Sequence, residues 1–257
     1  MASSLNALAA TSLKSLHRPG KPLVLANVYD VLSARAVAAL PSCRALATAS
    51  YAVARANATE DDDMDMETNL KAILPIAKVA AEFKKPFTVD IQDGYGERLE
   101  EVMTELIEAG VHGVNLEDCD KNTQKLYPLG QAVSRIQRTL AVAESLGVSD
   151  FVVNARCDVL VHGGPLEEAI IRGKAYLDAG ATTVFVWGGS KRGVSRGEVT
   201  RMVQEFNGKL NVSMILSGGG LNVAGLSEIG VARISVGPQL QFMAMDNYAK
   251  EAEKIMV

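Results

Sequence analysis

The sequence predicts a single closed (β/α)8 barrel, and three observations support this prediction. The chain has 257 residues, a length that one α/β barrel typically occupies. Apolar residues make up 48% and charged residues 22%, as expected for a globular protein with a substantial core. Short β-rich runs alternate with helical stretches along the chain. This alternation predicts a parallel sheet covered by helices, and eight such units favour a closed barrel over an open doubly wound sheet.

The strands are expected where β-branched and apolar residues cluster between helical stretches. Eight such runs occur: P-L-V-L-A-N-V-Y from Pro22, R-A-L-A-T-A-S-Y from Arg44, F-T-V-D from Phe87, G-V-N-L-E-D from Gly113, F-V-V-N-A-R from Phe151, T-V-F-V-W-G from Thr183, V-S-M-I-L-S from Val212 and R-I-S-V-G from Arg233.

The helices are expected between these runs, where apolar residues recur at helical spacing and a glycine follows. Three segments show this pattern clearly: 99–109 before Gly110, 133–146 before Gly147, and 169–179 before Gly180. No proline-rich linker or shift in composition divides the chain, so we expect one domain over residues 1–257.

A short N-terminal helix is expected before the first strand. Leu5, Leu8, Leu13 and Leu16 have the spacing of an amphipathic helix lying on the domain. The first eighteen residues contain two basic residues and no acid, so they also weakly resemble an organelle transit peptide. We favour the helix.

Charge and cysteine content exclude several classes of protein. The net charge is -4 with scattered basic residues, so we expect no nucleic-acid partner. No apolar run reaches the roughly eighteen residues that span a bilayer, so we expect no membrane segment. Three cysteines, Cys43, Cys119 and Cys157, do not form a disulfide framework and favour a reducing compartment, which predicts a cytoplasmic protein.

Polar residues collect at the ends of the expected strands, where the active sites of parallel barrels lie. They are Asn27, Asp30, Ser50, Tyr51, Asp90, Gln92, Asp93, Glu117, Asp118, Asn154, Arg156, Asp158, Ser217 and Ser235.

Several carboxylates at one mouth would repel each other unless a cation lies among them. Oxygen ligands without paired Cys or clustered His fit Mg2+ or Mn2+ better than zinc. Arg156 can hold a carboxylate or phosphate with its planar fork of donors. A single strand-end Asp more often caps a helix or orders a turn, so the prediction depends on Asp90, Glu117 and Arg156 together. For Asp93 and Asp118, the alternative to a role in the site is that each only orients the loop in which it lies.

The motifs at these positions resemble those of the isocitrate lyase/phosphoenolpyruvate mutase superfamily along nearly the whole chain. The matching segments are L-V-L-A-N-V-Y-D-V-L-S-A from Leu23, S-Y-A-V-A-R-A-N-A-T-E-D from Ser50, D-I-Q-D-G-Y-G from Asp90, N-L-E-D from Asn115, N-A-R-C-D-V from Asn154 and G-V-A-R-I-S-V-G-P from Gly230.

The resemblance implies a (β/α)8 enzyme that binds Mg2+ and a small 2-oxo or 2-hydroxy acid. It implies that Asp90 anchors the metal, and that Glu117 and Asp61 hold its water shell, with Gln92 at the position of the second acid of the D-x-D motif. It further implies that Ser50 and the backbone of Tyr51 and Ala52 bind the carboxylate, with help from Arg156. The candidate catalytic residues are therefore Arg156, Glu117 and Asp61; the metal residues are Asp90, Gln92 and Glu117; and the substrate-binding residues are Ser50, Tyr51, Ala52, Arg156, Trp187 and Ser213.

Three departures from the family pattern bear on function. Gln92 brings no charge to the metal motif. The lyases' K-K-C-G-H loop is absent, which argues against isocitrate or methylisocitrate cleavage. Cys119 is a poor substitute for the cysteine of that loop, because it lacks the flanking basic and His residues that would tune its thiol. Lys121, Asn122 and Thr123 resemble in type the loop residues of the mutases and phosphonopyruvate hydrolases. Trp187 is placed to narrow the mouth or to stack on a substrate.

The expected function is cleavage of a C–C bond in a small acid such as oxaloacetate, by decarboxylation, hydrolysis or retro-aldol cleavage through a metal-bound enolate. The alternatives are a C–P bond enzyme, a phosphate-binding barrel using the glycine turns at Ser217 and Ser235, and a barrel that binds a metabolite without chemistry. We expect a homo-oligomer, a dimer or a tetramer. Family tetramers commonly exchange a C-terminal helix. Only about one helix, residues 239–257, follows the last strand here, so the sequence leaves open whether this exchange occurs.

Overall fold

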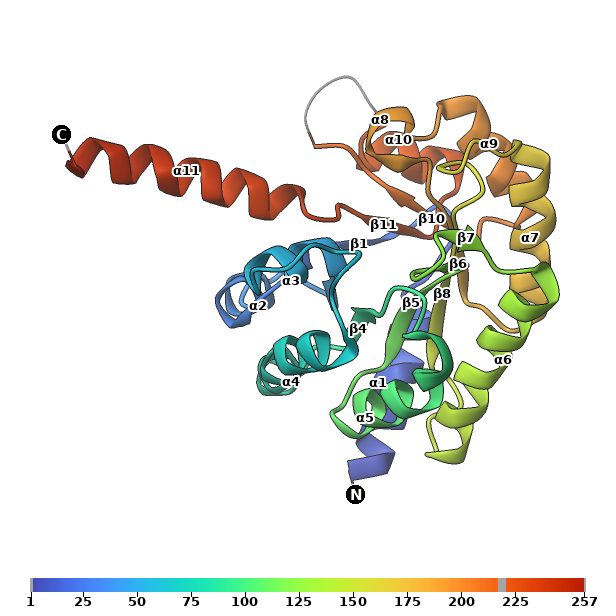
Figure 1. The fold of residues 1–257 in the computed structure, drawn as a ribbon, viewed down its shortest axis with the longest axis horizontal. Helices are drawn as coiled ribbons and strands as arrows, with labels where there is room; N and C mark the ends of the chain where they lie inside the picture. The colour runs from blue at the N-terminus through green and yellow to red at the C-terminus, as the bar shows by residue number, and fades with distance from the viewer. Residues whose placement is uncertain (1, 217–220, 257) are drawn as a thin grey trace.

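The computed structural model describes residues 2–216 and 221–256 and shows a nearly closed parallel barrel surrounded by helices (Figure 1). Nine strands follow in the order β1-β11-β10-β9-β8-β5-β4-β3-β2, and all pairs are parallel. The two end strands, β1 and β2, belong to one extended segment and are separated only by Ala26. β1 pairs with β11, the last strand, and β2 pairs with β3, so this segment closes the barrel. The (β/α)8 prediction is confirmed.

The barrel strands are β1 (Leu23–Leu25), β2 (Asn27–Val28), β3 (Leu46–Thr48), β4 (Phe87–Asp90), β5 (Gly113–Glu117), β8 (Val152–Cys157), β9 (Thr183–Val186), β10 (Leu210–Ser213) and β11 (Arg233–Ser235). A short antiparallel hairpin, β6 (Cys119–Asp120) with β7 (Lys125–Leu126), follows β5. The seventh predicted strand begins two residues earlier than Val212 and ends at Ser213, so Ser217 is not its last residue.

The helices are α1 (Ala2–Ser15), α2 (Val31–Ala38), α3 (Ser50–Ala56), α4 (Met66–Glu82), α5 (Leu99–Glu108), α6 (Leu129–Ser145), α7 (Leu166–Asp178), α8 (Gly189–Arg192), α9 (Arg196–Glu205), α10 (Val223–Ile229) and α11 (Gln239–Met256), with a 3-10 turn at Gly96–Arg98. None of these helices is long and apolar enough to cross a membrane.

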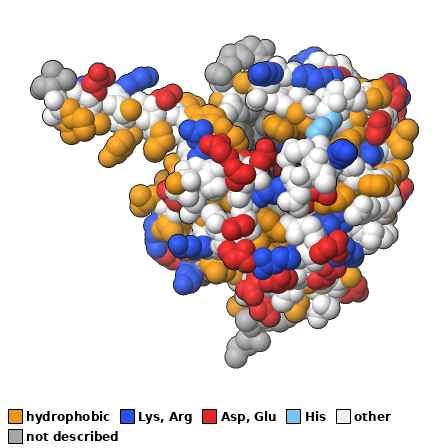
Figure 2. Space-filling view, in the orientation of Figure 1, with side chains coloured by type: hydrophobic (Ala, Val, Ile, Leu, Met, Phe, Trp, Pro, Cys, Tyr) orange, Lys and Arg blue, Asp and Glu red, His pale blue; other side chains and the backbone are white. Residues whose placement is uncertain are grey.

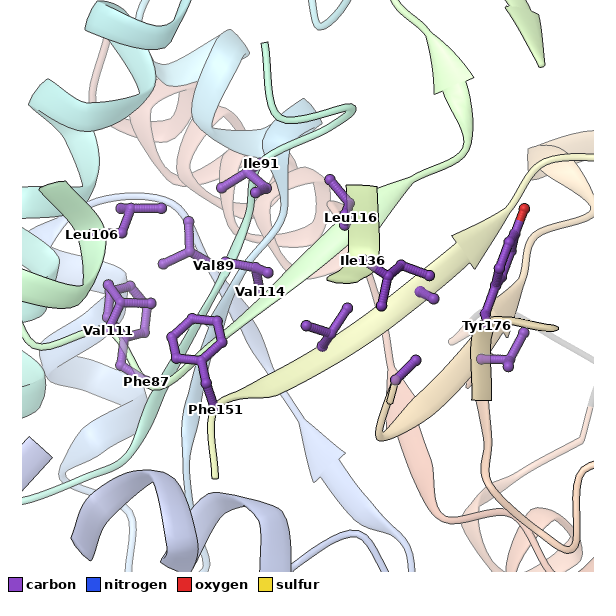
Figure 3. Packing of buried hydrophobic residues seen from close by; sticks show 14 of the residues in the cluster. Phe87, Val89, Ile91, Leu106, Val111, Val114, Leu116, Ile136, Phe151 and Tyr176 are labelled. Atoms are coloured by element: carbon purple, nitrogen blue, oxygen red, sulfur yellow. The ribbon is translucent and has the colours of Figure 1, made fainter. Parts of the chain in front are cut away.

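The main core lies between the sheet and the outer helices. In β4, Phe87 and Val89 turn outward and pack against residues of the neighbouring elements such as Leu106 and Val111 (Figure 3). The alternate residues Thr88 and Asp90 therefore face the barrel interior, because successive side chains of a strand point to opposite faces. This alternation places the polar residues of the strands inside the barrel.

The N-terminal helix α1 closes the bottom of the barrel. Leu13 and Leu16 are buried against residues of β1, β3 and β8, whereas Leu5 and Leu8 are each 67% exposed. The amphipathic stripe predicted from the four leucines is thus buried only at its C-terminal end, because the N-terminal half of the helix projects beyond the barrel (Figure 1).

The C-terminal helix α11 leaves the barrel and projects away from it (Figure 1). Of its residues, Gln241 is buried, while hydrophobic side chains are exposed along its length (Figure 2). The exposed ones include Met243 at 57%, Tyr248 at 72% and Ile255 at 84%. This helix packs little of its surface against its own barrel.

Candidate active site

A cavity of about 600 Å³ opens at the carboxyl ends of the strands and reaches into the barrel. Its walls bring together most of the residues that the sequence singled out: Ser50, Tyr51, Asp61, Asp90, Arg156, Trp187 and Ser213 line it. Ala52, Gln92 and Glu117 are not among the lining residues.

Asp90 ends β4, and its carboxylate is fixed by two donors from neighbouring elements. Its carboxylate accepts hydrogen bonds from the backbone N–H of Ser50, 3.0 Å, and from the side-chain amide of Asn115, 2.9 Å. Asn115 in turn accepts from Asn154, 2.8 Å, which accepts from the hydroxyl of Thr183, 2.7 Å. This chain of hydrogen bonds crosses four adjacent strands and holds the carboxylate at the cavity wall. The sequence did not single out Asn115 or Thr183; inward-facing polar residues in otherwise apolar strands were the available signal.

Arg156 lies between two carboxylates. Its Nη1 is 2.5 Å from Glu117 Oε1 and its Nε is 2.7 Å from Asp158 Oδ1, and the three side chains are at most 13% exposed. Burial raises the pKa of Glu117 well above its usual range, although the charge of Arg156 opposes this. Burial alone would lower the pKa of Arg156, but the charges of Asp158 and Glu117 raise it, so this side chain stays charged. Glu117 therefore acts on the cavity through Arg156.

Asp61 comes close to Asp90 from the segment before α4. Burial, and next the charge of Asp90, raise the pKa of Asp61 to about 6, while a hydrogen bond from Ser50 lowers it. A carboxyl group whose ionisation is disfavoured by a neighbouring carboxylate at a cavity wall is a suitable place for a cation.

Gln92 does not line the cavity, but its amide nitrogen lies 3.2 Å from the carboxylate of Asp61, which does. Its amide nitrogen donates to the backbone carbonyl of Asp61, 2.6 Å, and its amide oxygen lies 3.2 Å from Lys121 Nζ. Lys121, on the hairpin, also donates to the carbonyl of Met64. The sequence predicted a metal role for Gln92. In the structure, its amide links the hairpin to the segment around Asp61.

The predicted carboxylate site at the start of α3 is partly formed. Ser50 and Tyr51 line the cavity, but the N–H of Ser50 donates to Asp90 and the N–H of Ala52 donates to the carbonyl of Ala49, 3.0 Å. The N–H group of Ala52 is therefore used in the first turn of the helix, and the residue shapes the backbone at this edge of the site.

Trp187 follows β9 and covers Arg156. The guanidinium carbon of Arg156 is 4.1 Å from the ring centroid of Trp187, the geometry of a cation–π interaction. Ser213, at the end of β10, lies on the same cavity wall. An anion that binds Arg156 would thus meet the indole ring.

Four other strand-end acids have structural partners. Asp30 caps α2 through the N–H of Ser33, and Asp93 accepts from the hydroxyl of Tyr127, 2.8 Å. Asp118 accepts from the N–H of Asp158, 2.8 Å, and from the hydroxyl of Tyr176, 2.6 Å. The fourth, Asp158, pairs with Arg156 as described. These contacts agree with the capping and loop-orienting roles that the sequence left open for such acids.

Cys119 is a buried thiol at the base of the hairpin. Burial, and then the charge of Asp158, raise its pKa to about 12. Its Sγ lies 3.4 Å from Nε2 of His162. The thiol stays protonated, in keeping with a plain strand-end cysteine.

The glycine turns proposed as a phosphate site have other roles where the structure describes them. The N–H groups of Val236 and Gly237, after the last strand, both donate to Oδ1 of Asn27 at 3.0 Å. The hydroxyl of Ser235 contacts Asn211. The S-G-G-G segment at 217–220 lies outside the described residues.

A hydrated Mg2+ fits the residues that are present. No group of three or more His, Cys, Asp or Glu within the described ranges is arranged to hold a metal. Mg2+, however, commonly keeps several waters and binds through one or two carboxylates. Asp90 and Asp61 provide such a pair at the cavity wall.

Comparison with known proteins decides the family. The family model for phosphoenolpyruvate phosphomutase matches residues 13–256. The chain belongs to this family. An uncharacterised protein of Mycobacterium tuberculosis is 30% identical over 228 residues, which cover 88% of this chain and 81% of that protein. A solved structure from Burkholderia cenocepacia J2315 is 34% identical with a TM-score of 0.87, covering 97% of this chain and 99% of the other.

Named members of the superfamily are lyases, mutases and hydrolases, and this chain is an enzyme of the same superfamily. The structure of 2,3-dimethylmalate lyase is 26% identical with a TM-score of 0.84, covering 96% of this chain and 84% of the lyase. Two less similar structures share the fold: an oxaloacetate acetylhydrolase with the product oxalate, 24% identical, and a phosphonopyruvate hydrolase with oxalate and Mg2+, 22% identical. A curated phosphonopyruvate hydrolase of Variovorax sp. is 28% identical over 196 residues, 64% of its length.

Proposed function

We propose that this enzyme binds Mg2+ and cleaves a C–C bond in a small 2-oxo carboxylic acid such as oxaloacetate. The observation that carries the proposal is the placement of Asp90 and Asp61 on one wall of a deep cavity that also holds Arg156, fixed between Glu117 and Asp158. Two solved relatives that hold oxalate, one of them together with Mg2+, support this substrate class.

Asp90 and Asp61 would hold the hydrated metal, which when bound supplies positive charge next to the oxygen that becomes negative as the bond breaks. Arg156 binds and orients an anionic group of the substrate through its remaining N–H groups. Glu117 and Asp158 keep the guanidinium in one orientation, and Trp187 covers it and excludes water from that side.

The test is a titration with oxalate, a planar mimic of a pyruvate enolate, with and without Mg2+. Trp187 is the only tryptophan of the chain, so its fluorescence reports directly on binding at Arg156. We expect binding that requires Mg2+ and is lost in Asp90→Asn, while Asp63→Asn, an exposed acid of the neighbouring segment, behaves as wild type. Equal binding without metal, or unchanged binding by Asp90→Asn, would contradict the proposal.

A second candidate is cleavage of a C–P bond, as in phosphonopyruvate. The hairpin supports it, because Lys121 reaches the Asp61 segment, with Asn122 and Thr123 beside it in the chain. Assays with oxaloacetate and phosphonopyruvate in parallel, measuring pyruvate or oxalate release against phosphate release, separate the two candidates.

We also propose a homo-oligomer in which α11 binds a second copy of this chain. Its exposed hydrophobic side chains, including Met243, Tyr248 and Ile255, form the surface that would be covered.

A further inference from the structure

Five residues that are paired in register on adjacent strands cross the inner face of the barrel, and the last of them is a second arginine, Arg233. Glu117 of β5 pairs in register with Arg156 of β8, Arg156 with Phe185 of β9, Phe185 with Asn211 of β10, and Asn211 with Arg233 of β11. Neighbours in register on a parallel sheet point to the same face, and the last four of these residues all line the cavity. Arg156 and Arg233 are three strands apart, roughly 14 Å along the sheet.

These two arginines differ in their partners. Arg156 is paired with Glu117 and Asp158. Arg233 is 4% exposed, and its Nε and Nη1 have no hydrogen-bond partner. A third cationic residue of the cavity wall, Arg192, pairs with Glu198 at the rim. Among the described residues of the wall, Arg233 is therefore the cation that lacks a carboxylate partner.

The surroundings of Arg233 leave it charged and enclosed. Burial lowers its pKa to about 10 and the charge of Asp90 opposes this, so the guanidinium is protonated at neutral pH. On the bottom side, Leu13 of α1 and its apolar neighbours close the barrel. The nearby His17 is neutral, because burial, and then the charge of Arg233, lower its pKa to about 3. Buried charges in proteins are normally paired or hydrogen-bonded, and here the open side is the cavity.

Polar groups next to Arg233 could complete an anion site. Asn211, its neighbour in register, lies 3.3 Å from the hydroxyl of Ser235, and both residues line the cavity. The base of the cavity thus combines one arginine that has no ion-pair partner with neutral polar groups.

We propose that Arg233 forms a second anion-binding subsite at the base of the cavity and binds the anionic group of the substrate that is distal to its 2-oxo acid end. This inference rests on the proposed function, and it restricts the substrates to 2-oxo acids that carry a second carboxylate or a phosphonate. Monoanionic acids such as pyruvate would leave Arg233 without a partner and bind weakly.

The test compares ligands that differ in the distal group, each with Mg2+, by calorimetry. Oxalate occupies only the 2-oxo acid end, 3,3-difluorooxaloacetate adds a carboxylate, and phosphonopyruvate adds a phosphonate. We expect Arg233→Gln to bind oxalate within about twofold of wild type but to lose at least about tenfold in affinity for a ligand with a distal anion. The ligand that loses more identifies the distal group as carboxylate or phosphonate.

Two further variants serve as controls. Arg233→Lys keeps the charge and is expected to recover part of the lost affinity. Arg201→Gln, which changes the charge by the same amount on the surface of α9, is expected to bind every ligand as wild type does. The melting temperature of Arg233→Gln without ligand is expected not to fall, because an unpaired buried charge is removed.

The subsite is refuted if Arg233→Gln weakens all ligands equally, if it weakens none, or if it lowers the melting temperature together with oxalate binding. Failure of the proposed function has a different signature, since the wild type would then bind no oxalate in the presence of Mg2+.

Discussion

The indole ring of Trp187 lies over the guanidinium of Arg156, with 4.1 Å between the guanidinium carbon and the ring centroid. Trp187→Ala should weaken binding of an anionic ligand by roughly fivefold, because a cation–π contact contributes about 1 kcal/mol. Trp187→Phe should retain most of the affinity. Calorimetry with oxalate and Mg2+ measures both variants, and an unchanged affinity in Trp187→Ala would show that the ring does not contribute to binding.

Removal of Arg156 should destabilise the fold as well as the site. Arg156→Met leaves Glu117 and Asp158 buried without a counter-charge, so the free energy of unfolding should fall by about 3–5 kcal/mol in a urea titration. Arg35→Met removes an exposed partner of Glu82 and should cost at most about 1 kcal/mol. Similar losses in the two variants would mean that the buried pair is compensated in another way.

The effect of Mg2+ should depend on pH through Asp61. Its pKa is about 6 in the folded chain and 3.8 as the usual value, so the folded chain binds this proton more tightly than the unfolded chain. Its contribution to stability is therefore fully present below about pH 4 and is lost as pH rises through 6. Mg2+ should restore stability above pH 6, when the carboxylate is ionised, and should have little effect at pH 5.

Melting temperatures between pH 4.5 and 8, with and without Mg2+, test this dependence. Asp61→Asn should be more stable than wild type at pH 7.5 without metal and should respond less to Mg2+, whereas Asp63→Asn should follow the wild-type curve. If the melting temperature of Asp61→Asn depends on pH as that of the wild type does, another group is responsible for the pH dependence.

The turn that follows Trp187 leaves no room for a side chain at Gly188. A Cβ there would lie 1.8 Å from the carbonyl oxygen of Gly193, so Gly188→Ala must displace the 188–193 segment and with it Trp187. We expect at least a tenfold loss of turnover with the barrel still folded, measured by activity and circular dichroism.

Gly197→Ala is the matched control, because a Cβ at this helical position meets no atom within 4 Å. It should be neutral or stabilising by up to about 1 kcal/mol. Wild-type turnover in Gly188→Ala would show that the turn does not position the indole ring.

The exposed hydrophobic face of α11 should determine the oligomeric state. Replacing Met243, Tyr248 and Ile255 together by glutamine should shift the chain from an oligomer to a monomer, because it removes the apolar surface that a second copy would bury. Size-exclusion chromatography with light scattering measures the mass. A control replacement of Leu32, which is 77% exposed on α2, should leave the mass unchanged. A wild-type chain that is already monomeric would contradict the proposal.

Much of the architecture could be predicted from local patterns. The spacing of apolar residues and the glycines after the helices were sufficient for the eight strands, although the first strand is divided at Ala26 and the seventh begins at Leu210. Strand ends also identified Asp90 and Arg156 as cavity residues, because the carboxyl ends of parallel strands meet at one mouth.

Partners of individual side chains could not be predicted in the same way. Gln92 has a motif position that suggests a metal ligand, yet its amide joins Asp61 and Lys121, which come from two different loops. Asn27 occupies the N–H groups of Val236 and Gly237, some 210 residues later in the chain.

By itself, the sequence determined the barrel, its order of elements and the acids at its mouth, because periodicity and strand ends are properties of neighbouring residues. The tertiary structure decided that Arg156 is neutralised while Arg233 is not, and that α11 leaves the barrel. Charge pairing and burial depend on distances across the closed sheet, and those distances are set only when β1 meets β11.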